Sequence, residues 1–139
     1  MAKRVMGFGT WPSPVTPAML TSGVVGLVDV WVDGGTTVWS EARPSEGGRQ
    51  AIVALGPDGA RRDVLPATVN VRSGVHEYGG GAAWVEAGTV WYVDWSDQRL
   101  YRAPLDGSTD PVALTPEPPA PRARRYADMR CSPDGRWVV

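Results

Sequence analysis

The sequence of 139 residues is poor in the side chains on which many catalytic and metal sites depend. It holds one cysteine, Cys131, and one histidine, His76, beside seven tryptophans and four tyrosines. A single cysteine cannot form a disulfide within the chain, and we interpret Cys131 as a small buried residue kept in a reducing compartment. We therefore expect a cytoplasmic protein.

Long apolar runs and an excess of charge of one sign are also missing. No segment approaches the ~20 apolar residues of a membrane span, and no apolar run of signal-peptide length follows the basic start, MAKR. Fourteen basic and fifteen acidic residues give a net charge of −1, which is not the pattern of a nucleic-acid-binding surface. We expect neither a membrane nor a nucleic acid as partner.

The motifs of common active sites and metal sites do not occur. His76-Glu77 lacks the second histidine of an H-E-x-x-H zinc motif, and no twelve-residue calcium loop follows the Asp-Gly pairs. No G-x-S-x-G pentapeptide marks a serine as nucleophile. We therefore predict no catalytic residue, no cofactor and no metal within these residues.

What the chain does contain is a change of hydrophobic period at Gly26. Before it the chain is rich in proline and glycine, and we expect one short helix at residues 17–22, with Thr16 as N-cap and Pro17 in the first turn. After it, GLVDVWV alternates in a period of two. The segments TTVWSEA, RQAIVAL and ARRDVLP follow, with turn residues DGG and GPDG between strands. This pattern is typical of short antiparallel strands.

The four-strand pattern then recurs. The triplet TVW stands at residues 37–39 and again at 89–91, and the Asp-Gly turn at 58–59 returns at 106–107. A third Asp-Gly, followed by a tryptophan, stands in SPDGRW. Four strands in a period of about 50 residues are typical of a β-propeller blade, here of the WD40-like or TolB-like kind.

We accordingly expect an all-β fold: a partial β-propeller of about two four-stranded antiparallel blades plus the start of a third, with a short N-terminal helix. The predicted division is an N-terminal segment 1–25 and an incomplete propeller 26–139, with blades at 26–66 and 79–116 and a third beginning at 124–139. Propellers have about 4–8 blades, so we expect a fragment of a longer protein. Uncovered blade faces would favour self-association.

The loop SGVHEYGGG, residues 73–81, is the candidate functional segment. We expect its three glycines to let the backbone turn sharply into the innermost strand of the second blade. His76, Glu77 and Tyr78 would then lie near the central channel. Either these side chains satisfy backbone groups and fix the loop, or one of them contacts substrate. We favour the first interpretation for His76 and leave both open for Glu77.

Four segments carry a family resemblance: GTWPSPVT near the start, NVRSGVHEYGGGA at 70–82, WSDQRLYR at 95–102, and RYAD with SPDGRW between 125 and 137. Together, and in this order, they resemble the N-terminal propeller of the prolyl oligopeptidase (S9) family of serine peptidases. The most similar branch comprises acylaminoacyl-peptidases and dipeptidyl aminopeptidases. The resemblance extends over nearly the whole chain.

The resemblance implies a serine peptidase that cleaves short peptides. A C-terminal α/β-hydrolase domain would hold the Ser-Asp-His triad, and the propeller would gate access of the peptide substrate and form part of the active-site wall. In the dipeptidyl branch a glutamate pair binds the amino terminus of the substrate; no such pair occurs here, so this role is not transferred to Glu77. His76, Glu77 and Tyr78 remain the candidate substrate-binding residues. The alternative is a TolB-like interaction propeller without hydrolase activity.

Overall fold

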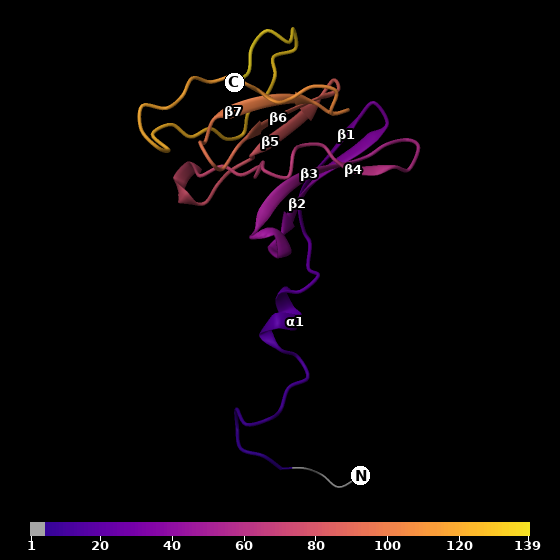
Figure 1. The fold of residues 1–139 in the computed structure, drawn as a ribbon, viewed down its shortest axis with the longest axis vertical. Coiled ribbons are helices and arrows are strands. Elements are labelled where there is room, and N and C mark those ends of the chain that lie inside the picture. The colour runs from indigo at the N-terminus through magenta and orange to yellow at the C-terminus, as the bar shows by residue number, and fades with distance from the viewer. Residues whose placement is uncertain (1–4) are drawn as a thin grey trace.

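The computed structural model describes residues 5–139, whose strands form two four-stranded antiparallel sheets (Figure 1). The first sheet has the order β1 (Gly26–Asp33), β2 (Thr36–Arg43), β3 (Arg49–Leu55) and β4 (Arg61–Asp63), and the second has the order β5 (Ala83–Glu86), β6 (Thr89–Val93), β7 (Leu100–Pro104) and β8 (Val112–Ala113). The helical elements are α1 (Pro17–Thr21) and the 3-10 turns η1 (Pro44–Glu46) and η2 (Val75–Glu77). The predicted fold class is confirmed.

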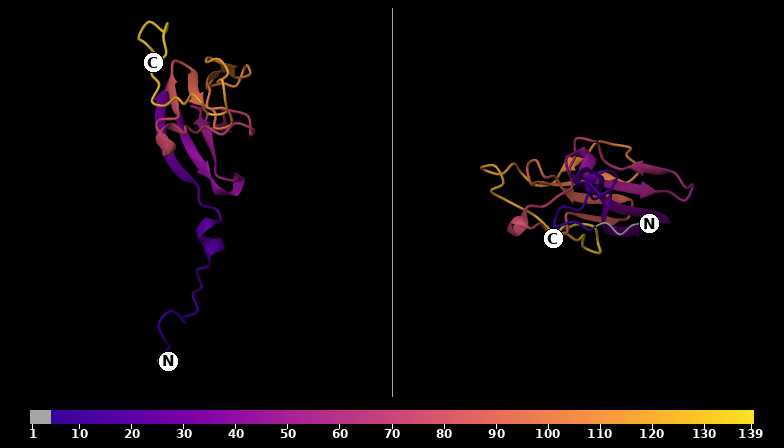
Figure 2. Two further views of the ribbon diagram at one scale, coloured as in Figure 1. Left: turned by 90° about the vertical axis from the view of Figure 1, so that its left-hand side faces the viewer. Right: turned by 90° about the horizontal axis from the view of Figure 1, so that it is seen from below.

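The helix α1 forms where the capping residues predicted it. The Thr16 hydroxyl accepts a hydrogen bond from the backbone N–H of Met19 at 3.2 Å, and Pro17 opens the first turn. The helix lies on an arm that leads away from the sheets (Figures 1 and 2). On this arm the side chains of Phe8 and Trp11 are exposed. Within residues 5–139 no helix combines the length and the apolar character needed to cross a membrane.

Two-residue turns close the first hairpin of each sheet. Between β1 and β2, Gly34 and Gly35 have φ of 53° and 83°, the left-handed conformation that a primed hairpin turn requires. Between β5 and β6, Ala87 and Gly88 have φ of 48° and 72°. The predicted DGG turn is thus confirmed, and its counterpart in the second sheet has the same geometry.

The two sheets pack against each other through one hydrophobic core. At its centre Val38 of β2 and Val90 of β6 are fully buried, and both occupy the middle of the repeated TVW triplet. The other buried members are Ile52, Ala54, Val64, Leu65, Val69, Val71, Ala82, Ala83, Val85, Tyr92, Ala103 and Leu105. Burying a side chain of valine size or larger stabilises the fold by about 1.5–3 kcal/mol. β1 and β5 also contact each other, as the inner strands of neighbouring blades do.

Hydrogen bonds at the rim join the hairpin of one sheet to the hairpin of the next. The Asp33 carboxylate, at the end of β1, accepts from the backbone N–H groups of Ala87 and Gly88 at 3.0 and 2.6 Å. Nearby, the guanidinium of Arg62 donates to the carbonyl of Leu105 at 2.8 Å. These bonds fix the register of one sheet against the other, which apolar packing alone does not specify.

The far face of the second sheet is partly covered by residues 126–138. Trp84 and Trp91 pack there with Met129 and Val138. Residues 124–139, predicted to begin a third blade, contain one isolated bridge, between Cys131 and Val138, and no strand. The expectation that Cys131 is buried was wrong, since its side chain is partly exposed.

On the far face of the first sheet, apolar side chains of β1 are uncovered by any described residue. Leu27, Val30 and Val32 of β1 are 74%, 68% and 76% exposed, and we call these three residues the open face. Beside them lies a hollow of about 670 Å³. Here Trp39 occupies the place that Trp91 has in the second sheet, and Arg61 stacks on its ring at 5.6 Å.

A buried carboxylate anchors the polar side chains beside the open face. Glu41 is only 3% exposed. It accepts hydrogen bonds from the Trp39 indole at 2.8 Å, the Arg43 guanidinium at 2.9 Å and the Arg61 guanidinium at 2.6 Å. Burial acts to raise the pKa of Glu41, but these bonds and charges outweigh it and hold the pKa below its usual range. The carboxylate therefore stays ionised and fully paired.

Replacing Asp33 tests the hydrogen bonds that join the hairpins of the two sheets. Asp33→Ala removes a charged acceptor from two backbone donors and should lower the free energy of unfolding by about 1–3 kcal/mol. Asp33→Asn keeps one acceptor oxygen and should lose less. Urea unfolding measures both. The control is Asp58→Ala, because among the described residues the Asp58 carboxylate accepts only from Ala60, two residues away in its own turn. Equal losses at Asp33 and Asp58 would contradict the role of Asp33 between the sheets.

Candidate functional site

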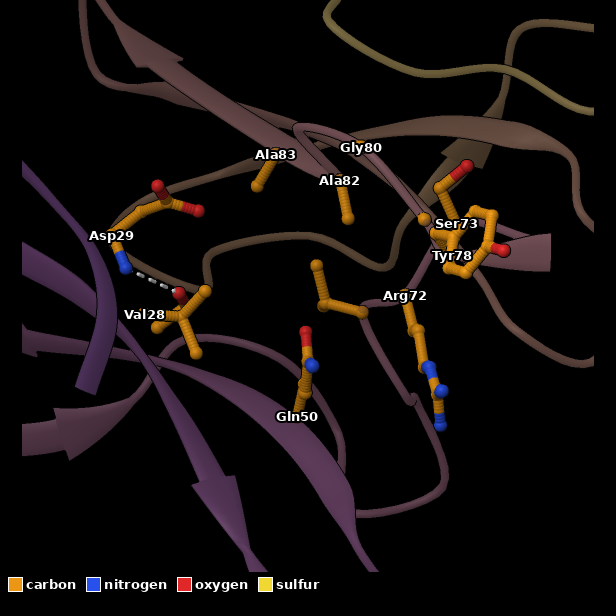
Figure 3. A pocket seen from close by; sticks show the side chains of 12 residues that line it. Val28, Asp29, Gln50, Arg72, Ser73, Tyr78, Gly80, Ala82 and Ala83 are labelled. Carbon is orange, nitrogen blue, oxygen red and sulfur yellow. Dashed lines mark hydrogen bonds between the residues drawn. The ribbon is translucent and has the colours of Figure 1, made fainter. Parts of the chain in front are cut away.

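A polar pocket of about 200 Å³ lies where the two sheets meet, beside the loop 73–81. The first sheet contributes Asp29, Ser40 and Gln50, and the connection to the second sheet contributes Arg72 and Tyr78. Figure 3 shows Asp29 and Gln50 on one side of the pocket and Tyr78 on the other. The pocket is thus shared between the two sheets and forms only when they pack together.

An irregularity in β1 positions the acidic group of this pocket. The register of β1 against β2 shifts between Leu27 and Val30, which is a bulge that redirects side chains. Within it, the backbone N–H of Asp29 donates to the Ser40 hydroxyl at 3.0 Å. The Asp29 side chain, the Gln50 amide and the Tyr78 phenol supply one carboxylate and two groups that can both donate and accept hydrogen bonds. Such a set suits the amide and amine groups of a peptide.

The loop itself has an unusual backbone. His76 and Glu77 both have positive φ, 52° and 64°, although neither is glycine. Each such residue costs on the order of 1 kcal/mol or more and persists only where its surroundings hold it. The side chains of His76, Glu77 and Tyr78 all lie on the surface. Tyr78 is 95% exposed.

Gln98 holds the start of the loop from beneath. Its side chain is fully buried, and its Oε1 accepts from the backbone N–H of Gly74 at 2.6 Å. Its Nε2 donates to the carbonyls of Arg72 and Trp95, each at 3.3 Å. The Trp95 ring lies under the guanidinium groups of Arg72 and Arg122, 4.5 and 4.1 Å from its centroid. The motif WSDQRLYR therefore supports the loop that precedes it in sequence.

Residues 125–128 hold the loop from the other side. The Ser73 hydroxyl donates to the carbonyl of Tyr126 at 2.6 Å. Gly81 and Asp128 exchange two bonds, from the Gly81 N–H to the Asp128 carboxylate at 3.0 Å and from the Asp128 N–H to the Gly81 carbonyl at 2.7 Å. Between these two anchors, Arg125 donates to the Gly74 carbonyl at 2.6 Å and forms an ion pair with Glu77.

Two different physical reasons explain why glycine occupies positions 79, 80 and 81. Gly79 has φ of 94°, so it makes the sharp turn predicted for this stretch. Gly80 and Gly81 do not have positive φ. A Cβ on Gly80 would stand 2.8 Å from the Cβ of Ala127, and one on Gly81 would stand 2.6 Å from Oδ1 of Asp128. The prediction of a backbone turn holds for Gly79 and was wrong for the other two, which are small because the segment 125–128 packs on them.

Of the three predicted site residues, Tyr78 lines the pocket, whereas Glu77 pairs with Arg125 outside it. His76 is exposed and outside the pocket lining. Sequence reasoning did not assign a site role to Asp29, Gln50, Gln98 or Arg125, although Gln98 stands in the motif WSDQRLYR and Arg125 in the motif RYAD. No cluster of three or more ligating side chains occurs within the described part of the chain.

Two packed four-stranded antiparallel sheets, with their first strands in contact, define an incomplete β-propeller. Comparison with solved structures places this portion in a family. A puromycin-hydrolysing peptidase of Mycobacterium tuberculosis matches with a TM-score of 0.82 and 36% identity, over 98% of this chain and 21% of that one. A puromycin hydrolase matches with a TM-score of 0.77 and 32% identity, over 92% and 20%. A mutant puromycin hydrolase complexed with PGG matches with a TM-score of 0.76 and 33% identity, over 89% and 20%.

These neighbours are peptidases of the prolyl oligopeptidase type, and this chain corresponds to their propeller portion. The resemblance predicted from sequence is confirmed. The chain spans about a fifth of the length of the structures it matches. Neither the comparison with protein-family models nor that with curated protein sequences gave a match.

Replacing Gly80 tests the contact between the loop and residues 127–128. Gly80→Val, and to a smaller extent Gly80→Ala, should destabilise the second sheet by about 1–3 kcal/mol because the added atoms overlap Ala127. Thermal unfolding measures the effect. The control is Gly7→Ala, where the new Cβ would lie 3.8 Å from its nearest neighbour, Thr10. If Gly80→Val unfolds at the wild-type temperature, the packing account is wrong.

Proposed function

We propose that this chain is the propeller portion of a serine peptidase that cleaves short peptides, where it gates access of the substrate and forms part of the active-site wall. The observation that carries the proposal is the match, at 36% identity over 98% of this chain, to a puromycin-hydrolysing peptidase. In this proposal residues 26–66 and 79–116 are blades, 124–139 begins a third, and 1–25 is a separate N-terminal segment. The triad belongs to a C-terminal α/β-hydrolase domain, and the protein works in the cytoplasm.

The pocket between the sheets supports a contact with the peptide. Tyr78 presents an aromatic face and a hydroxyl at its edge, and aromatic rings contribute large contact area to bound ligands. Asp29 offers a carboxylate to a positively charged group, and Gln50 offers an amide to a peptide backbone. We therefore propose Tyr78 as the substrate-contacting residue among the three sequence candidates, with Glu77 and His76 beside it on the loop.

An interaction propeller without hydrolase activity finds no support in the comparisons, because the three similar structures are named as peptidases or hydrolases. The open face supports the expectation of self-association through uncovered blade faces. We propose that residues 1–139 produced alone self-associate, because Leu27, Val30 and Val32 would otherwise face water. In the longer protein a further blade would cover this face.

Replacing Tyr78 in the full-length protein tests the proposal. Tyr78→Ala should raise KM for short peptides with a free amino terminus about 5- to 10-fold, the loss of roughly 1 kcal/mol of aromatic contact, with little change in kcat. Tyr78→Phe, which keeps the ring, serves as the matched control and should stay near wild type. Puromycin is a second substrate to assay, since the similar structures are named for its hydrolysis.

Two outcomes of these assays would count against the proposal in different ways. Absence of peptidase activity in the wild-type full-length protein would reject the function itself. Normal KM values for Tyr78→Ala with every substrate would leave the peptidase assignment standing and remove Tyr78 from the substrate contacts.

A further inference from the structure

The tip of the loop, residues 74–79, depends on contacts from outside its own sheet. Within the tip, backbone bonds hold one turn together: the Glu77 N–H donates to the Gly74 carbonyl at 3.1 Å, the Gly79 N–H donates to the Val75 carbonyl at 2.9 Å, and the Tyr78 N–H also points to the Val75 carbonyl. That turn contains the two left-handed residues, His76 and Glu77. A turn with two left-handed non-glycine residues in sequence is strained and needs support from its surroundings to stay in a single conformation.

Arg125 supplies that support, because its guanidinium reaches both ends of the strained turn. One terminal nitrogen donates to the carbonyl of Gly74, where the turn begins, and also to the carboxylate of Glu77, where it ends. The Arg125 side chain is 29% exposed and that of Glu77 is 77% exposed. An ion pair with such an exposed partner adds little to global stability. What Arg125 provides is the geometry of the turn.

The neighbouring anchors cannot replace Arg125. Ser73 is bonded to Tyr126, and Gly81 to Asp128. The Ser73 hydroxyl also accepts from the Val75 N–H at 3.2 Å, and Gln98 holds the Gly74 N–H at 2.6 Å. These contacts fix the first residues of the tip and the end of the loop, whereas Arg125 also reaches Glu77 at the far end of the turn. Tyr78 directly follows Glu77 and is 95% exposed, so the backbone at Glu77 sets where its ring points.

We propose that Arg125 is a positioning residue for substrate binding: by clamping Gly74 and Glu77 it holds Tyr78 at the pocket between the sheets. This inference rests on the proposed function, since it assumes that Tyr78 contacts the peptide. It assigns Glu77 to the clamp, where it orders the loop. The residue that sets the geometry of the pocket therefore comes from the segment after the second sheet.

The test uses the full-length protein and compares Arg125→Ala with Arg124→Ala. Arg124 is the adjacent arginine, is exposed, and makes no side-chain bond with any residue in the range 5–139. Arg125→Ala should raise KM for short peptides about 5-fold, leave kcat within 2-fold and leave the unfolding temperature unchanged. Arg125→Lys should recover part of the loss, because an ammonium group can still pair with Glu77. Arg124→Ala should match wild type.

Two further measurements separate positioning from a general structural effect. Hydrogen exchange in Arg125→Ala should rise at the amides of 74–79 and stay unchanged in β6 and β7. Combined with Tyr78→Ala, Arg125→Ala should add less than 2-fold to KM, because the clamp acts through Tyr78. If the KM increases of the two single variants multiply in the double variant, the proposal is wrong. Unchanged hydrogen exchange at the amides of 74–79 in Arg125→Ala would also overturn it. If the wild-type protein cleaves no peptide, the proposed function fails, and the exchange result still decides whether Arg125 orders the loop.

Discussion

A four-stranded sheet with two apolar faces has to be covered on both sides, and the rest of this structure follows from that constraint. The two sheets bury one face each in a common core centred on Val38 and Val90. The second sheet has its other face partly covered by residues 126–138. The first sheet leaves Leu27, Val30 and Val32 in water. Apolar burial is the main favourable term in folding, so in the proposed longer protein this uncovered face is where a further blade would pack.

The same dependence on neighbours extends from the core to the candidate site. The pocket is lined by Asp29 and Gln50 from one sheet and by Tyr78 from the loop before the other. The loop is in turn held by Gln98, in the connection between β6 and β7, and by Arg125 beyond the second sheet. No single sheet contains the site. Its geometry is a property of three consecutive segments packed together, which agrees with the proposed role as part of an active-site wall.

Much of the fold could be predicted from local sequence. The period of two after Gly26, the paired glycines at 34–35 and the repeated TVW triplet depend on interactions between near neighbours, and the structure has strands and turns at those places. Thr16 and Pro17 likewise fixed the start of the helix. The strands expected in 124–139 did not form, since a strand needs a partner and this segment has a single bridge.

The details of the site could not be predicted in the same way. Gly80 and Gly81 have to be small because Ala127 and Asp128 pack against them. These contacts join residues more than forty positions apart, so no local sequence pattern indicates them. The pairing of Glu77 with Arg125 is equally remote in sequence. Asp29 was not singled out from the sequence, because the bulge that turns it toward the pocket leaves no mark in the alternation of GLVDVWV.

The most direct test of the account is the accessibility of the open face in the full-length protein. With Cys131 replaced by serine, a cysteine at Val30 can be labelled by a thiol reagent with and without denaturant. A covering blade predicts that the folded full-length protein protects this thiol, with labelling at least tenfold slower than in urea. Labelling at the same rate in both states would show the face to be open to solvent and would contradict the account of these sheets as blades.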